Sequence, residues 1–174
     1  MIFGHNRNDK GYSLVELIAV ITIMTVVVGV AGLSVTLMFS QDAQKAAKLI
    51  DDELAETRML SMSKSGAVSM VLHTDGSTEP TNNSIEIIRG GSTYKNVNID
   101  RIVSITVKGP TGESSPGDDV EIVFDKSNGS VVSVDGDPVP ANAVYEIIAA
   151  SKRGSAKTVT VTLVGNTGRH YIVK

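Results

Sequence analysis

The stretch "GYSLVELIAVITIMTVVVGVAGLSVTLMF", Gly11–Phe39, decides the fold of the N-terminal part of this chain. Leu17–Phe39 contains no charged side chain, yet Glu16 stands directly at its head. As a helix this run would be about 35 Å long, enough to cross the hydrocarbon core of a bilayer. A carboxylate entering hydrocarbon must be paired, protonated or drawn back to the interface. Membrane anchoring alone therefore does not explain why a glutamate stands at position 16.

The overall composition is that of a folded chain with two unlike parts. It has 174 residues, of which 41% are hydrophobic and 20% charged, and this is typical of one ordinary globular domain. The first forty residues take a disproportionate share of the apolar side chains. The absence of cysteine excludes disulfides, thiolate metal sites and thiol redox chemistry. We therefore expect two parts that occupy different solvents.

The residues around the apolar run predict its orientation in a membrane. Arg7 and Lys10 precede it, and basic residues favour the cytoplasmic side. A cleaved secretory signal has a shorter apolar region and a small-residue cleavage site, whereas this run continues into a polar helical stretch. The pattern predicts a single-pass membrane protein with a cytoplasmic N-terminus and an exported C-terminal domain.

The motif at the start of the run resembles that of a known family. Lys10–Glu16, "KGYSLVE", followed by the apolar helix is similar to the leader and N-terminal helix of type IV pilins and type II secretion pseudopilins. In that family a prepilin peptidase cleaves after the glycine and methylates the new terminus, and the helices then pack into a filament core. The resemblance implies cleavage after Gly11, N-methylation of Tyr12, and pairing of Glu16 with the terminal amine of an adjacent subunit.

The resemblance also implies the partners and the final location. They are prepilin peptidase, other pilin or pseudopilin subunits, the membrane assembly platform, and lipid before assembly into a cell-surface or periplasmic filament. Two departures stand out: Tyr12 replaces the usual phenylalanine, and Gly29 and Gly32 stand where many major pilins have a proline. The missing proline favours a minor subunit, although both glycines are equally explained by small-residue packing between membrane helices.

After Phe39 the residues keep helical spacing, but the chain is no longer apolar on every side. A stripe of small and apolar residues recurs at helical intervals: Ala43, Ala46, Ala47, Ile50, Leu54, Thr57 and Ser61. We expect one helix from about Tyr12 to about Lys64, with Gly66 as its terminator. Its second half would lie against a folded domain; a free-standing coiled coil is the alternative, but the stripe is too short for a convincing heptad seam.

From Ala67 onward, short β-branched runs alternate with turn signals. The predicted strands are "AVSMVLH", "SIEIIR", "RIVSITVK", "VEIVFD", "VVSV" and "TVTVTLV", with a final hairpin over "VTLVGNTGRHYIVK". We predict an α+β pilin fold, in which a long N-terminal helix packs on a mostly antiparallel sheet. The expected parts are a leader (1–11), a transmembrane and filament-core helix (12–39), an amphipathic helix (40–66) and an exported β-rich domain (67–174). The pattern from helix to final hairpin resembles the GspH/FimT type of minor pilin.

No pattern of residues predicts catalysis, a cofactor or a metal. His5, His73 and His170 are scattered and have no metal-ligand spacing, so we expect neither an enzyme nor a bound cofactor. The acid pairs Asp118–Asp119 and Asp135 with Asp137 offer oxygen ligands for Ca²⁺, but solvated turn acids explain them more simply.

The C-terminal segment is basic. It carries Lys152, Arg153, Lys157, Arg169 and Lys174 and no acid. Such charge suits contact with DNA phosphates or with an acidic neighbouring subunit. Some FimT-type pilins take up DNA through a Gly-Arg motif, which Gly168–Arg169 resembles, although Tyr171 stands where a second arginine would strengthen the match. DNA binding is thus the alternative to a purely structural function.

Overall fold

A computed structural model describes residues 13–63, 66–74, 83–114, 117–153 and 157–173, with the side chains of 30–40 excepted. The chain divides into two compact units, Met1–Leu37 and Met38–Lys174. Helix α1 extends over Leu14–Met62, within the range that the sequence predicts. Because Tyr12 and Lys64 lie outside the described residues, the predicted ends of the helix are not described.

The part of α1 in the second unit is amphipathic, as predicted. Each member of the predicted stripe is buried: Ala43, Ala46, Ala47, Ile50, Leu54, Thr57 and Ser61. The buried hydroxyl of Thr57 donates to the carbonyl of Glu53, so it adds no unpaired polar group to the core. The small residues of the stripe allow the helix to lie close to the strands beneath it. The second half of α1 therefore packs on the strands and is not a free-standing coiled coil.

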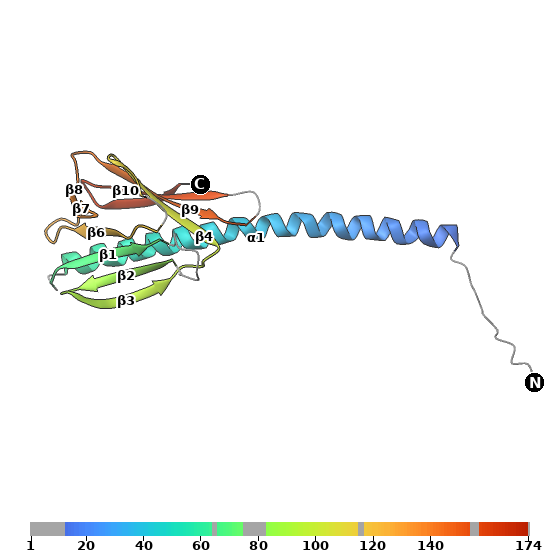
Figure 1. Cartoon of the computed structure of the whole chain (residues 1–174), viewed down its shortest axis with the longest axis horizontal. Coiled ribbons are helices and arrows are strands. Elements are labelled where there is room, and N and C mark those ends of the chain that lie inside the picture. The colour runs from blue at the N-terminus through green and yellow to red at the C-terminus, as the bar shows by residue number, and fades with distance from the viewer. Residues whose placement is uncertain (1–12, 64–65, 75–82, 115–116, 154–156, 174) are drawn as a thin grey trace, which may run out of the picture. The chain divides into compact units, whose positions relative to one another are not determined.

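Six strands form the first sheet, in the order β3-β2-β1-β6-β7-β8, and every neighbouring pair is antiparallel (Figure 1). Their bounds are β1 Val68–His73, β2 Ser84–Arg89, β3 Ser92–Asn98, β6 Val120–Phe124, β7 Val131–Val134 and β8 Asp137–Pro138. Strand β8 is therefore one edge of this sheet.

Five strands form the second sheet, in the order β11-β10-β9-β4-β5, again with antiparallel pairs only. Their bounds are β4 Val103–Gly109, β5 Gly112–Glu113, β9 Val144–Ser151, β10 Thr158–Val164 and β11 Arg169–Val173. The alternation in β10 places Val159, Val161 and Leu163 in the core, as expected. Its hairpin with β11 confirms the predicted final hairpin.

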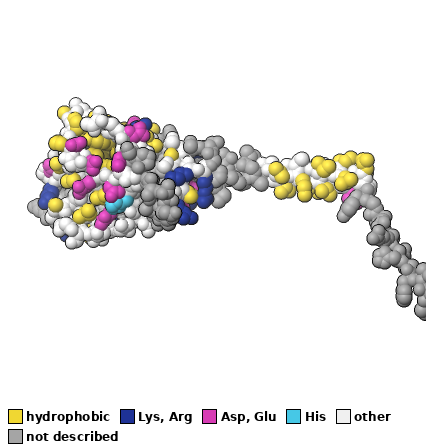
Figure 2. All heavy atoms as spheres, viewed as in Figure 1, with side chains coloured by type: hydrophobic (Ala, Val, Ile, Leu, Met, Phe, Trp, Pro, Cys, Tyr) yellow, Lys and Arg dark blue, Asp and Glu magenta, His cyan; other side chains and the backbone are white. Residues whose placement is uncertain are grey.

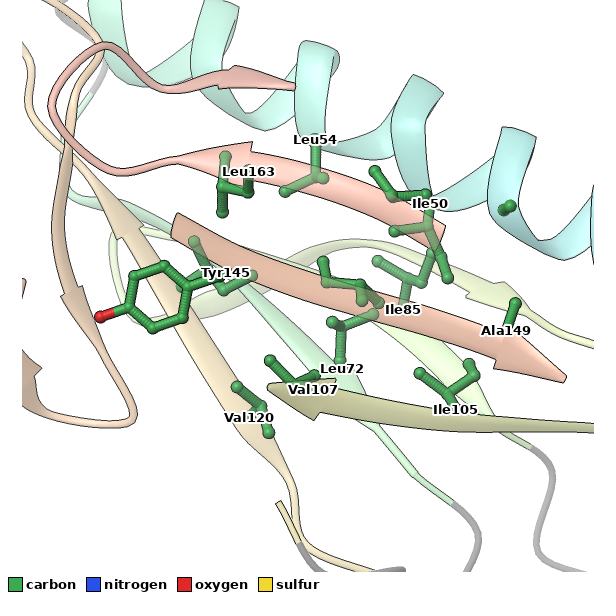
Figure 3. Close-up of a cluster of buried hydrophobic side chains, with 14 of the residues drawn as sticks. Ile50, Leu54, Leu72, Ile85, Ile105, Val107, Val120, Tyr145, Ala149 and Leu163 are labelled. Atoms are coloured by element: carbon green, nitrogen blue, oxygen red, sulfur yellow. The ribbon is translucent and has the colours of Figure 1, made fainter. Parts of the chain in front are cut away.

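One core joins the second half of α1 to both sheets. Figure 3 shows Ile50 and Leu54 of α1 directed toward strand side chains that include Leu163 and Ile85. These four side chains are fully buried, and the same cluster extends to other residues of both sheets. The α+β prediction is confirmed, with two antiparallel sheets in place of a single one.

Four strands were not predicted: β3, β5, β8 and β9. Strands β5 and β8 are only two residues long and lie in Gly- or Pro-containing turn sequence, and β3 and β9 each have a physical reason. Strand β3, "STYKNVN", is an edge strand whose side chains are mostly exposed, so it has no apolar alternation. Strand β9, "VYEIIAAS", contains glutamate and alanines that favour helix, yet it lies between β10 and β4 and is buried at every second residue. Its pairing partners, rather than its own propensity, determine its structure.

Candidate functional site

The predicted assembly residue Glu16 lies in the first turn of α1. The carbonyl of Ser13 accepts hydrogen bonds from the backbone N–H of Glu16, at 2.9 Å, and from that of Leu17, at 3.2 Å. The Glu16 side chain is exposed. A carboxylate in the first turn also suits the partial positive charge of a helix N-terminus. Its charge is therefore available to a partner that approaches the end of the helix.

The helix that follows Glu16 exposes apolar side chains on all sides. From Leu14 to Val28 its large apolar residues are between 46% and 74% exposed, and Figure 2 shows them along the described part of this helix. Continuous apolar surface of this kind marks a site of lipid or protein contact. Within the described residues, no helix meets the length and hydropathy required of a membrane span. Gly11 and Tyr12 lie outside the described residues.

A partly buried ion-pair cluster attaches α1 to the edge strand β3. The Lys95 ammonium donates to both oxygens of Glu53, at 2.7 and 2.8 Å, and to Glu56 Oε2 at 2.7 Å. The Glu53 side chain is only 6% exposed, whereas that of Lys95 is 35% exposed. Hydrogen bonds to Glu53, and then to Glu56, raise the pKa of Lys95. Sequence analysis missed this cluster because Glu53 and Lys95 are far apart in the chain.

The structure separates the predicted basic residues into two places. Lys152, Arg153 and Lys157 are exposed where β9 ends and β10 begins. Arg169 pairs with Val164 at the other end of β10, about 20 Å away along the strand. Lys174 lies outside the described residues. Strand β10 carries the chain to its far end before the turn, so Arg169 lies away from Lys152, Arg153 and Lys157.

Gly168, half of the predicted Gly-Arg motif, has a structural explanation. Its φ is +61°, and a Cβ atom there would stand 1.9 Å from the carbonyl oxygen of Gly129. The same carbonyl accepts a hydrogen bond from Arg58 Nε at 2.9 Å. Glycine is therefore required where this turn packs against the neighbouring loop, independently of any ligand.

The two described histidines, His73 and His170, contact acids. His73 Nε2 is 3.2 Å from Glu86 and its Nδ1 is 3.0 Å from Asp119. His170 Nε2 is 3.9 Å from Asp51 Oδ1, which is buried without a hydrogen-bond partner in the described part of the chain. Among the described residues, no group of three or more His, Asp or Glu is placed to hold a metal ion. The acid pairs considered for Ca²⁺ therefore do not form such a group.

Comparison with known proteins bears on both units. Residues 6–32 match the family model described as "Prokaryotic N-terminal methylation motif". The structure is similar to a crystal structure of the Pseudomonas aeruginosa type IV minor pilin FimU, with a TM-score of 0.50 and 14% identity over 77% of this chain and 90% of that chain. A second FimU crystal form has a TM-score of 0.48 and 13% identity, over 75% of this chain and 92% of that one. No curated protein sequence matches this chain.

The motif bears out the predicted prepilin-type N-terminus, and the fold is similar to that of a type IV minor pilin. The methylation motif covers the segment that contains Gly11, Tyr12 and Glu16. The fold of this chain is that of a minor pilin, while the narrower GspH/FimT type stays a prediction.

Proposed function

We propose that this chain is a minor structural subunit of a type IV pilus or a type II secretion pseudopilus, processed by prepilin peptidase and assembled through its N-terminal helix. One observation carries the proposal. A prokaryotic N-terminal methylation motif over residues 6–32 occurs in a chain whose fold is that of a type IV minor pilin. Neither feature requires an enzymatic reaction by this chain.

The proposed assembly reaction begins in the membrane. The apolar helix anchors the precursor in lipid with Arg7 and Lys10 on the cytoplasmic side, until cleavage after Gly11 gives Tyr12 a methylated terminal ammonium. The assembly platform then transfers the subunit from lipid to neighbouring helices. An unpaired carboxylate is costly in that apolar surrounding, so Glu16 favours the one register in which it meets the terminal ammonium of another subunit.

Intact mass spectrometry of the protein extracted from membranes tests the processing step. We expect a species that lacks residues 1–11 and carries one methyl group on Tyr12. Substitution of Gly11 by a bulky residue should leave the precursor uncut. A mature protein that still begins at Met1 would contradict the proposal, whatever the behaviour of its β domain.

Substitution of Glu16 tests the assembly step separately. Glu16→Leu and the nearly isosteric Glu16→Gln should both insert and be cleaved, yet enter filaments poorly because the partner ammonium is left unpaired. Thr22→Leu is the matched control, since the Thr22 hydroxyl only donates to Ile18 within the same helix. Equal amounts of all three variants in sheared filaments would refute the pairing role.

DNA binding is the second candidate function. The observation that favours it is the group of exposed cations Lys152, Arg153 and Lys157 where β9 ends and β10 begins. Gel shifts of the full chain in detergent should then weaken with salt and with Lys157→Ala. Arg169→Ala is the matched control, because that cation lies at the other end of β10. Absence of salt-sensitive binding would exclude this function.

A further inference from the structure

A pocket of about 260 Å³ opens where the edges of the two sheets meet. One wall comes from β5 and the end of β4, and the other from β8 and the end of β7. Strands β5 and β8 are both edge strands, so this is a place where neither sheet continues. The pocket is smaller than the roughly 300–1,000 Å³ of drug-sized sites and suits a single side chain.

A nearly buried tyrosine lines this pocket. Tyr145 is 7% exposed and lines the pocket, and Figure 3 shows its oxygen directed away from the other labelled core side chains. Its ring lies against Gly109, where an added Cβ would stand 2.7 Å from Tyr145 Cε1. The Tyr145 hydroxyl has no hydrogen-bond partner among the described residues and is accessible to solvent within the pocket. A ligand group can therefore reach it.

The electrostatic environment of the pocket is negative. Glu113, Asp118, Asp135 and Asp137 line it, and no Lys, Arg or His is among its lining residues. Lys108 pairs with Glu113 at 3.2 Å, so the negative charge of the pocket is assigned to Asp135 and Asp137. Burial, and then the nearby charge of Asp137, raises the pKa of Tyr145. The chemistry of the pocket therefore favours a cation.

The form of the pocket distinguishes among cations. The described carboxylates do not form a metal-holding group, so a chelated divalent ion is disfavoured. Val107, Val120 and Val134 supply apolar walls, which suit an alkyl stem more than a hydrated ion. The pocket thus matches a group with a charged tip on an apolar stem, as in lysine and arginine.

We propose that this pocket receives a lysine or arginine side chain of a neighbouring filament subunit, with the Tyr145 hydroxyl as acceptor and the aspartates around it as counter-charge. The choice of a neighbouring subunit as the source rests on the proposed function. Strands β5 and β8 beside the pocket are sheet edges, and such edges are places where a partner segment can dock. A contact of this kind joins unlike surfaces of successive subunits, as an open-ended filament requires.

NMR of the full processed chain in non-ionic detergent, with ¹³C-labelled tyrosine rings, tests the binding chemistry. Titration with N-acetyl-lysine methylamide should shift the Tyr145 ring signal saturably and leave those of Tyr94 and Tyr171 unchanged. The neutral analogue N-acetyl-norleucine methylamide and Ca²⁺ should not shift it. An equal response to norleucine, or a response to Ca²⁺ alone, would overturn the proposal.

Two charge-removing variants and one control complete the test. Asp137→Asn and Asp135→Asn should each weaken lysine binding about five- to tenfold. Asn tolerates the left-handed backbone that Asp135 adopts, with φ of 54°, so this variant keeps the fold. Glu146→Gln is the matched control, because Glu146 follows Tyr145 in β9 and is exposed on the opposite face. It should leave binding unchanged.

Incorporation into filaments identifies the source of the side chain. The double variant Asp135→Asn with Asp137→Asn should be cleaved after Gly11 as efficiently as the parent chain, yet enter filaments several-fold less. Normal incorporation would exclude a neighbouring subunit as the occupant. An uncut N-terminus would instead count against the proposed function, so the two failures are distinguishable.

Discussion

Removal of the Lys95 ammonium should destabilise the second unit by leaving the Glu53 carboxylate buried without its cation. In Lys95→Met, Glu53 loses donors at 2.7 and 2.8 Å while its side chain stays 6% exposed. Loss of hydrogen bonds to a charged group costs roughly 1.5–3 kcal/mol, and fully buried pairs cost more. Because Lys95 is 35% exposed, water reaches the site and favours the lower part of this range.

We therefore expect a loss of about 2 kcal/mol in the free energy of unfolding, or roughly 4–8 °C in melting temperature. Thermal unfolding of the full chain in detergent, followed by circular dichroism, measures it. The matched control is Lys108→Met, whose partner Glu113 is half exposed, so this change should cost less than about 0.5 kcal/mol. Glu53→Gln added to Lys95→Met should restore about 1 kcal/mol by removing the buried charge.

The pH dependence provides a further check on the same cluster. Since hydrogen bonds to Glu53 and Glu56 raise the pKa of Lys95, the folded state holds this proton more tightly than the unfolded state. The stabilisation is therefore fully present below the ordinary value of 10.5 and declines as the pH rises through the folded pKa. The difference in melting temperature between the parent chain and Lys95→Met should decrease above that pH. A melting temperature equal to that of the parent chain at neutral pH, with no gain from Glu53→Gln, would refute the reasoning.

Two further predictions concern single contacts in the β domain. Gly168→Ala should lower the free energy of unfolding by about 3 kcal/mol or more, because its Cβ would overlap the Gly129 carbonyl. Gly91→Ala, at φ of +80° in open space, should lower it by only about 1–2 kcal/mol. Thermal melts compare the two variants, and equal losses of stability would count against the overlap. Hydrogen bonds from the Thr93 hydroxyl and then His73 hold the pKa of Glu86 below its ordinary value of 4.5, so the stabilisation is present above that value and is lost as the pH falls through the folded pKa. The melting temperature of the parent chain should therefore approach that of Glu86→Gln as the pH falls. A difference in melting temperature that stays constant between neutral and acidic pH would contradict this.

The features that could be predicted are those carried by local patterns. The stripe from Ala43 to Ser61 has helical spacing, and each of its members is buried because the helix lies on both sheets. The strand from Thr158 to Val164 alternates, and its valines and Leu163 enter the core. In both cases one face of a regular element is apolar, which is a property of neighbouring residues alone.

The features that could not be predicted depend on contacts between distant segments. Strand β9 is assigned by its pairing with β10 and β4, although Glu146 and its two alanines favour helix. The cluster of Glu53 with Lys95 joins residues 42 positions apart. The separation of Arg169 from Lys157 follows from the length of β10, which lies between them, and a list of basic residues does not show it. The sequence therefore gives the number of basic residues, and only the fold shows which of them share a surface.

Glu16 and Tyr145 illustrate two ways in which a polar group indicates function. Glu16 is conspicuous in the sequence because it interrupts an apolar environment, and its proposed partner, the amine of Tyr12, is created only by cleavage of the chain. Tyr145 is inconspicuous in the sequence, since tyrosine is common in strands; its missing hydrogen bond becomes visible only when Gly109 and the aspartates are placed around it. Among the described residues neither side chain has a hydrogen-bond or ion-pair partner, and a partner from another subunit is proposed for each. The assembly of subunits accounts for both, with one contact proposed through the helix and the other through the edges of the two sheets.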